Sequence, residues 1–197
     1  MKQRSLLLVA GLSLLLLVWF VPVEGATGGY FSAHMLRHMT VVALATPLIV
    51  LGAPGLFADV KVSPLLASVV EFLIVWGWHL PAFHDHARAN PVMLASEQLS
   101  FLLAGLLLWA SVLKPREALA GAGGLFLTSM HMTLLGAILI LSPRLLYQAD
   151  ICRLGGVPDQ QMGGMIMLAI GTPVYLVASL VLLSKELRSG RNGELAP

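Results

Sequence analysis

A short run of metal-binding side chains, from His34 to Met39, is the part of this sequence best suited to chemistry. On a helix, residues four apart stand on one face about 6 Å from each other, so His34 and His38 can share one metal ion. Met35 and Met39 have the same spacing on the adjoining face. Imidazole combined with thioether suits copper, and thioether favours Cu(I). The alternative is a helix end at a membrane surface, where histidine bonds to backbone or lipid headgroups and methionine fills space.

Other histidines and methionines stand in or beside the remaining apolar segments, among them His79, His131, Met132 and Met162. His131 falls near the middle of its apolar segment, where an unpaired polar ring is costly, so it needs a partner inside a bundle. A metal ion and an interhelical hydrogen bond fit that requirement equally well.

Two carboxylates, Glu71 and Glu97, also fall inside apolar segments. An isolated charge at the centre of a bilayer costs about 3 kcal/mol or more, so each is expected to be protonated or paired. Glu97 lies towards the same membrane face as the first histidine pair and can neighbour it. Glu71 lies nearer the opposite face, and we expect a structural role for it.

The composition predicts that the segments holding these residues cross a membrane. The chain is 57% hydrophobic and 11% charged, with a mean hydropathy of +0.85, whereas soluble domains carry about 25% charged residues. Each apolar stretch is close to the roughly 20 residues that a helical span requires, and none alternates with the period of a strand. The prediction is an all-α polytopic membrane helix bundle forming one domain, residues 1–197, with six spans near 6–22, 36–53, 66–83, 92–113, 124–142 and 162–184.

Topology follows from the first span and from the basic residues. Lys2 and Arg4 before the first apolar run also fit a secretory signal, in which case removal of residues 1–26 would leave five spans. We favour an uncleaved anchor, because Glu24 suits a cleavage site badly. More Lys and Arg residues fall on the side of the N-terminus, so both termini are predicted to be cytoplasmic, with His34, His38 and His79 at the outer face and His84 and His86 in an outer loop.

Several function classes lack their motifs in this sequence. There is no phosphate-binding glycine loop, no nucleophile elbow and no Cys-x-x-Cys, and Cys152 is the only cysteine. A net charge of +2 is too small to indicate a nucleic-acid partner. We therefore expect a non-enzymatic membrane protein whose surroundings are lipid.

The order of the motifs resembles one known family. The matching segments are His34 to Met39, Leu51-Gly52-Ala53-Pro54, Trp78-His79-Leu80-Pro81, Ser96-Glu97, His131-Met132 with Leu135-Gly136, and Asp159 to Gly164. Together they resemble the polytopic CtaG-type cytochrome c oxidase assembly factors over residues 31–184. The chain departs from that pattern at Gln98, where the family pattern has histidine, and in having six spans where seven are usual.

The resemblance implies a bacterial inner-membrane protein needed to mature a haem-copper oxidase, with copper, as Cu(I), delivered to its metal centres. Oxidase subunits and periplasmic copper chaperones are the implied protein partners. The positions that match the family, and that are carried over as candidate copper ligands, are His34, His38, His79 and His131, with Met35, Met132 and Met162 as weaker candidates.

Two other functions fit the same residues. In a haem-binding membrane cytochrome, His38 and His131 would be axial ligands from two helices. In a transporter or a structural scaffold, Glu71, Glu97 and His131 would form a polar relay or packing bonds.

Overall fold

The computed structural model describes residues 2–114, 118–147 and 155–194, and every regular element in them is helical, which confirms the all-α prediction. Cys152 lies outside the described residues. The elements in chain order are α1 (Lys2–Phe20), α2 (Glu24–Thr27), α3 (Tyr30–Met39), the π-helix η1 (Thr40–Ala45), α4 (Thr46–Gly52), the 3-10 helix η2 (Pro54–Phe57), α5 (Pro64–Trp78), α6 (Pro81–Ala89), α7 (Pro91–Val112), α8 (Ala118–Leu141) and α10 (Gly156–Glu194).

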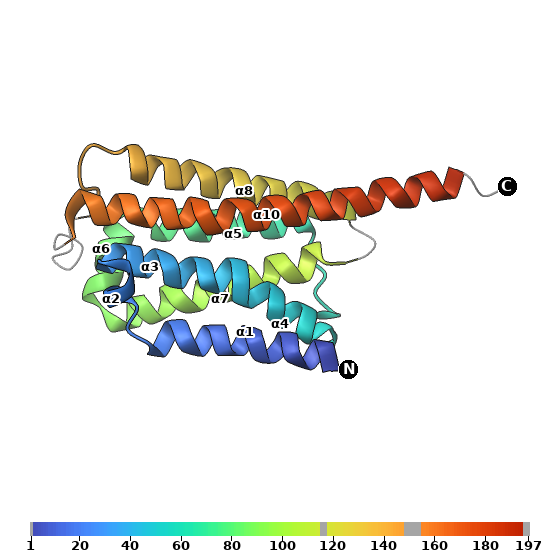
Figure 1. Ribbon diagram of the computed structural model, residues 1–197, viewed down its shortest axis with the longest axis horizontal. Helices are drawn as coiled ribbons and strands as arrows, with labels where there is room; N and C mark the ends of the chain where they lie inside the picture. Colours follow the sequence, from blue (N-terminus) through green and yellow to red (C-terminus); the bar gives the residue numbers. More distant parts are fainter. Residues whose placement is uncertain (1, 115–117, 148–154, 195–197) are drawn as a thin grey trace.

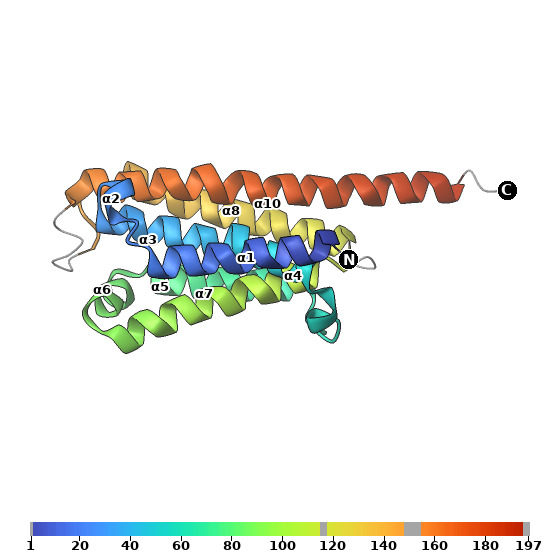
Figure 2. The same cartoon turned by 60° about the horizontal axis from the view of Figure 1, so that its bottom comes forward.

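The long helices run side by side in one bundle (Figures 1 and 2). The start of α1 and the end of α10 lie at one end, which we call the terminal end, and α10 extends beyond the bundle there. At the opposite end lie α2, the start of α3, α6 and the start of α10, and we call this the α6 end. Five helical segments are long and apolar enough to cross a membrane, and the bent pair α5 and α6 can make a sixth.

The third span differs from the predicted 66–83. Helix α5 has 15 residues, about 22 Å at 1.5 Å per residue, which is less than the roughly 30 Å of hydrocarbon. Leu80 is extended, as a residue before proline prefers, and Pro81 starts α6 at an angle of 69° to α5. His84 and His86 therefore lie on a short helix rather than in a loop.

Helix α3 is anchored at its first turn by a residue far along the chain. Both carboxylate oxygens of Asp159, in the first turn of α10, accept hydrogen bonds at 2.9 Å from the backbone amides of Phe31 and Ser32. These amides are among those that a helix leaves unpaired at its start. The contact fixes α3, which carries His34 and His38, against α10.

The π-helix η1 provides a backbone carbonyl that accepts several hydrogen bonds inside the bundle. The wider turn of a π-helix interrupts the regular backbone hydrogen bonds of the α-helix. The Val42 carbonyl accepts hydrogen bonds from Thr46 Oγ1 (2.8 Å), Trp109 Nε1 (2.9 Å) and the Tyr175 hydroxyl (3.1 Å). Three helices are thereby tied to one carbonyl. Where α8 meets α10, Gly136 and Gly164 let the two backbones approach closely.

Replacing Asp159 tests the anchoring of α3. We expect Asp159→Ala to lower the free energy of unfolding by about 0.5–2 kcal/mol, the usual effect of losing a helix-start acceptor. Thermal unfolding of the detergent-solubilised protein measures the change. Asp59→Ala, at an exposed aspartate, is the matched control and should leave the midpoint unchanged. Equal midpoints for both variants would contradict the anchoring role.

Candidate metal centre

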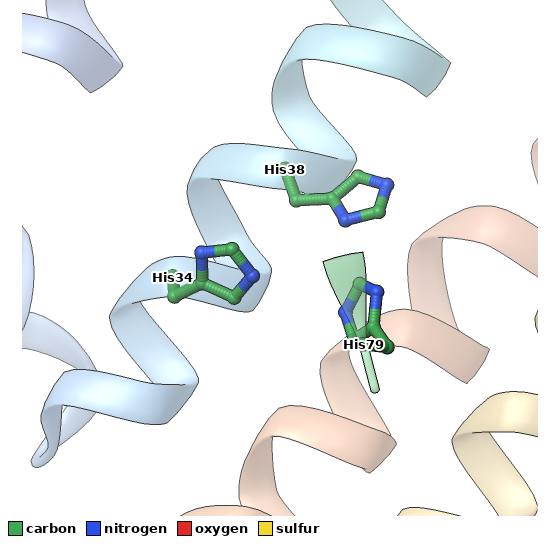
Figure 3. A group of neighbouring side chains, drawn as sticks. All are labelled: His34, His38 and His79. Atoms are coloured by element: carbon green, nitrogen blue, oxygen red, sulfur yellow. The ribbon is translucent and has the colours of Figure 1, made fainter. Parts of the chain in front are cut away.

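Three imidazoles meet at the α6 end of the bundle. The ring centroids are 6.2 Å apart for His34 and His38, 5.7 Å for His34 and His79, and 5.3 Å for His38 and His79. One ligand nitrogen from each ring lies within 4.8 Å of the other two. Figure 3 shows the rings around a common space, with His34 and His38 projecting from the same face of α3. We call His34, His38 and His79 the inner set.

The local structure explains how these rings come together. The four-residue spacing on α3 brings His34 and His38 onto one face, as the sequence predicts. His79 is the C-cap residue directly after α5, so the shortness of that helix places it inside the bundle. Its Nδ1 lies 2.6 Å from the Val75 carbonyl, which assigns the proton to Nδ1 and leaves Nε2 able to bind a metal.

Five of the six ring nitrogens of the inner set are buried without a hydrogen-bond partner among the described residues. The side chains are 1%, 0% and 5% exposed for His34, His38 and His79, and both nitrogens of the first two and Nε2 of the third lack a partner. Buried polar groups are normally paired, and an unpaired group often marks an ion site. Three neutral imidazoles are a donor set that suits copper or zinc, so these residues fit a bound transition metal.

A second group of possible ligands shares His34 with the inner set. One ligand atom each from His34, His84 and Glu97 lies within 4.8 Å of the others, and all three side chains are buried. The rings of His34 and His84 are 5.0 Å apart, and His34 Nδ1 lies 3.7 Å from Glu97 Oε2. We call His34, His84 and Glu97 the outer set.

The sequence prediction omitted His84 from the candidate ligands. The signal that could have found it is Leu80-Pro81, because proline favours the first turn of a helix and so predicts a helix, not a loop, around His84. The expectation that Glu97 neighbours the histidine cluster agrees with its place in the outer set. Glu97 is also paired with Arg88 of α6 and accepts a hydrogen bond from Gln98 Nε2 at 3.3 Å.

His131 lies apart from both sets. Its ring packs edge-on against Phe72, with centroids 5.3 Å apart, and neither of its nitrogens has a hydrogen-bond partner among the described residues. The interhelical hydrogen bond that the sequence left open for His131 is therefore not formed within the described chain. His131 belongs to neither the inner nor the outer set.

The candidate methionines are positioned towards α10 or the surface. Met35 and Met132 pack closely against glycines of α10, which leave room for them. A Cβ added to Gly163 would lie 3.0 Å from Met35 Cγ, and one added to Gly171 would lie 3.6 Å from Met132 Cβ. Both side chains are fully buried in these contacts, whereas Met162 is 41% exposed. The structure thus brings together imidazole and carboxylate donors, while Met35 and Met132 lie against glycines of α10.

Glu71 takes part in the polar network around η1. Its Oε1 lies 2.9 Å from the hydroxyl of Tyr175, which also contacts the Val42 carbonyl. The carboxyl is fully buried and belongs to neither ligand set. This position agrees with the structural role expected from the sequence.

A groove of ≈ 620 Å³ reaches His34 from the outside of the bundle, between the α1–α3 region and α7. Its polar lining includes Arg88 and an ion pair between Arg37 and Glu24 at 2.8 Å. Partial burial acts to raise the pKa of Glu24, but hydrogen bonds from its own backbone and Arg37, with the Arg37 charge, leave that pKa below its ordinary value. The Glu24 carboxylate is therefore ionised and neutralises Arg37 at neutral pH.

A comparison of the chain with models of protein families identifies its family. The family model described as cytochrome c oxidase caa3 assembly factor (Caa3_CtaG) matches residues 1–189. The chain belongs to the Caa3_CtaG family. The resemblance found in the sequence is thereby confirmed, and the Caa3_CtaG assignment supports a role in cytochrome c oxidase assembly for this multi-pass membrane protein. Searches of curated proteins and of solved structures gave no match.

The unpaired imidazoles predict an unusual effect on stability. In copper-free protein, His38→Leu should leave the free energy of unfolding unchanged or raise it, because an unpaired buried polar group costs about 1–3 kcal/mol. Excess Cu(I) should then stabilise the wild type more than the variant, since a ligand that binds the native state adds to its stability. Thermal unfolding with and without Cu(I) measures both effects.

His86→Leu is the control for that measurement, because His86 is an exposed histidine on α6. It should respond to Cu(I) as the wild type does. A large loss of stability in copper-free His38→Leu would show that His38 has a structural partner in the folded protein, and would contradict the unpaired state of its ring nitrogens.

Proposed function

We propose that this Caa3_CtaG member serves oxidase assembly by holding a copper ion as cargo in the inner set, at the outer face of a bacterial inner membrane. The observation that carries the proposal is that His34, His38 and His79 converge while their facing nitrogens have no protein partner among the described residues. A purely structural cluster would be expected to pair such nitrogens.

The choice of copper rests on the donors and on the family. Imidazole suits several transition metals, including copper and zinc, so the donor set restricts the choice to these metals and does not select one of them. The family role in cytochrome c oxidase assembly favours copper, because the oxidases concerned are expected to be haem-copper enzymes that need it. Three neutral ligands suit Cu(I), which binds with low coordination number and is readily passed to a partner's ligands.

The outer location is supported by the distribution of charge. Basic residues that stand in or beside segments at the terminal end are Lys2, Arg4, Lys61, Lys114, Lys185 and Arg188. At the α6 end, fewer basic residues of this kind are described, namely Arg37, Arg88 and Arg144. By the positive-inside tendency the terminal end faces the cytoplasm, and the inner set then lies towards the periplasm. Oxidase subunits and periplasmic copper chaperones can reach it there.

Copper binding by the purified protein tests the proposal directly. We expect stoichiometric Cu(I) in detergent-solubilised protein under reducing conditions and a loss of affinity of at least about a hundredfold in His34→Ala/His38→Ala. Competition with a chromophoric Cu(I) chelator gives the affinity. His131→Ala and His86→Ala are the matched controls, because neither residue belongs to a ligand set. Wild-type protein that holds no copper under these conditions would refute the proposal.

The same preparation tests the haem hypothesis. Two axial histidines would give the protein a Soret absorption band. A band that disappears in both His38→Ala and His131→Ala would favour the cytochrome over the copper-holding function.

A test in cells separates copper delivery from a scaffold role. In a strain that lacks the protein, the purified oxidase should contain less copper, and wild-type protein should restore it while His34→Ala/His38→Ala should not. The copper content per oxidase, measured by elemental analysis, is the readout. Full restoration by the double variant, at equal protein abundance in the membrane, would favour a scaffold.

A further inference from the structure

We infer that the outer set, His34, His84 and Glu97, is a second copper position through which the ion passes to the inner set. This inference rests on the proposed function, since it presupposes that the inner set receives copper. The three ligand atoms lie within 4.8 Å of one another, close enough that a single ion could be held among them. They come from three elements, α3, α6 and α7, so the position exists only in the folded bundle.

His34 connects the two positions through its two ring nitrogens. Its Nδ1 is the atom that lies 3.7 Å from Glu97 Oε2. Figure 3 shows a ring nitrogen of His34 directed towards the space beside His38 and His79. Because a neutral imidazole presents one lone pair at a time, the ion occupies the two positions in turn, with His34 as the ligand common to both. Transfer then replaces His84 and Glu97 by His38 and His79, and the ring proton of His34 moves from Nε2 to Nδ1, beside Glu97, as the ion moves from Nδ1 to Nε2. The oxidation state of the ion does not change.

Arg88 occupies the place of the cation when the outer position is empty. Glu97 is fully buried, and a buried carboxylate requires a nearby positive charge. Arg88 supplies that charge to Oε2, while Oε1 has no hydrogen-bond partner among the described residues. A copper ion at the outer position would repel the guanidinium and take over its role, so Arg88 competes with the ion for Glu97.

The groove provides the route to this position. It is lined by both His34 and Arg88, together with Gln98, which donates a hydrogen bond to Glu97. The Arg88 side chain is 13% exposed, so it lies between the open groove and the fully buried carboxylate. Displacement of Arg88 into the groove therefore opens the path to the outer set.

The test isolates the outer position by disabling the inner one. In a His38→Leu background, which retains His79 and its bond to the Val75 carbonyl, we expect each chain to bind one copper ion. Adding Glu97→Gln or His84→Ala should then weaken binding by about a hundredfold or more. Adding Arg88→Gln should tighten it by on the order of tenfold, because a competing cation has been removed. The probe is Cu(I) in competition with a chromophoric chelator.

Two variants control for folding and for the kind of side chain changed. Glu71→Gln alters another fully buried carboxylate, and His86→Ala alters an exposed histidine on the helix that carries His84. Both should leave copper binding in the His38→Leu background unchanged. Thermal unfolding of each copper-free variant identifies any that fails to fold. Loading with Cu(II) adds a spectroscopic readout, since electron paramagnetic resonance should show two coordinated imidazole nitrogens.

The outcomes separate this inference from the proposed function. If His38→Leu binds no copper while the wild type binds one ion, the outer position is overturned and the inner one stands. If Glu97→Gln and His84→Ala have no effect in either background, Arg88 and Glu97 form only a structural pair, which also overturns the inference. If the wild type itself binds no copper, it is the proposed function that fails.

Discussion

The structure depends on the need to compensate polar groups that are buried in a bundle surrounded by lipid. Water cannot reach such groups, and an unpaired polar atom or charge there costs several kcal/mol. At the α6 end, four buried imidazoles cluster, two of them, His34 and His84, lie beside the buried carboxylate of Glu97, and one guanidinium balances its charge. Several ring nitrogens of the inner set remain without a protein partner among the described residues. A cation held as proposed would compensate these nitrogens.

Short and anchored elements create that arrangement. Because α5 ends at Trp78, well short of a full membrane crossing, His79 lies within the bundle instead of at its rim. Pro81 then redirects the chain so that α6 crosses the end of the bundle and brings His84 over His34. Asp159, in the first turn of α10, fixes the start of α3. The ligand sets are therefore built from rigid helices whose ends are held by proline or by a buried carboxylate.

The polar groups around η1, deeper in the bundle, form a network of a different kind. Glu71 and Tyr175 contact each other, and the Val42 carbonyl that the π-helix exposes accepts bonds from Trp109 and Tyr175. This network joins α5, α7 and α10 to η1 without leaving a converging group of free donors. The buried carboxyl group of Glu71 thus belongs to the internal packing, whereas Glu97, near the groove, lies beside His34 and His84. The difference lies in what surrounds each carboxylate, since the residue type is the same.

The sequence by itself determined the helical membrane fold, the family and the pairing of His34 with His38, because hydropathy and a four-residue spacing act locally along a helix. It also indicated that Glu97 lies near the histidines, from its depth in a predicted span. Only the tertiary structure decided that His79 completes the inner set, that His84 and Glu97 form an outer set, and that His131 lies apart. Those relations depend on where separate helices end and how they cross, and such contacts between distant segments leave no periodic pattern in the sequence.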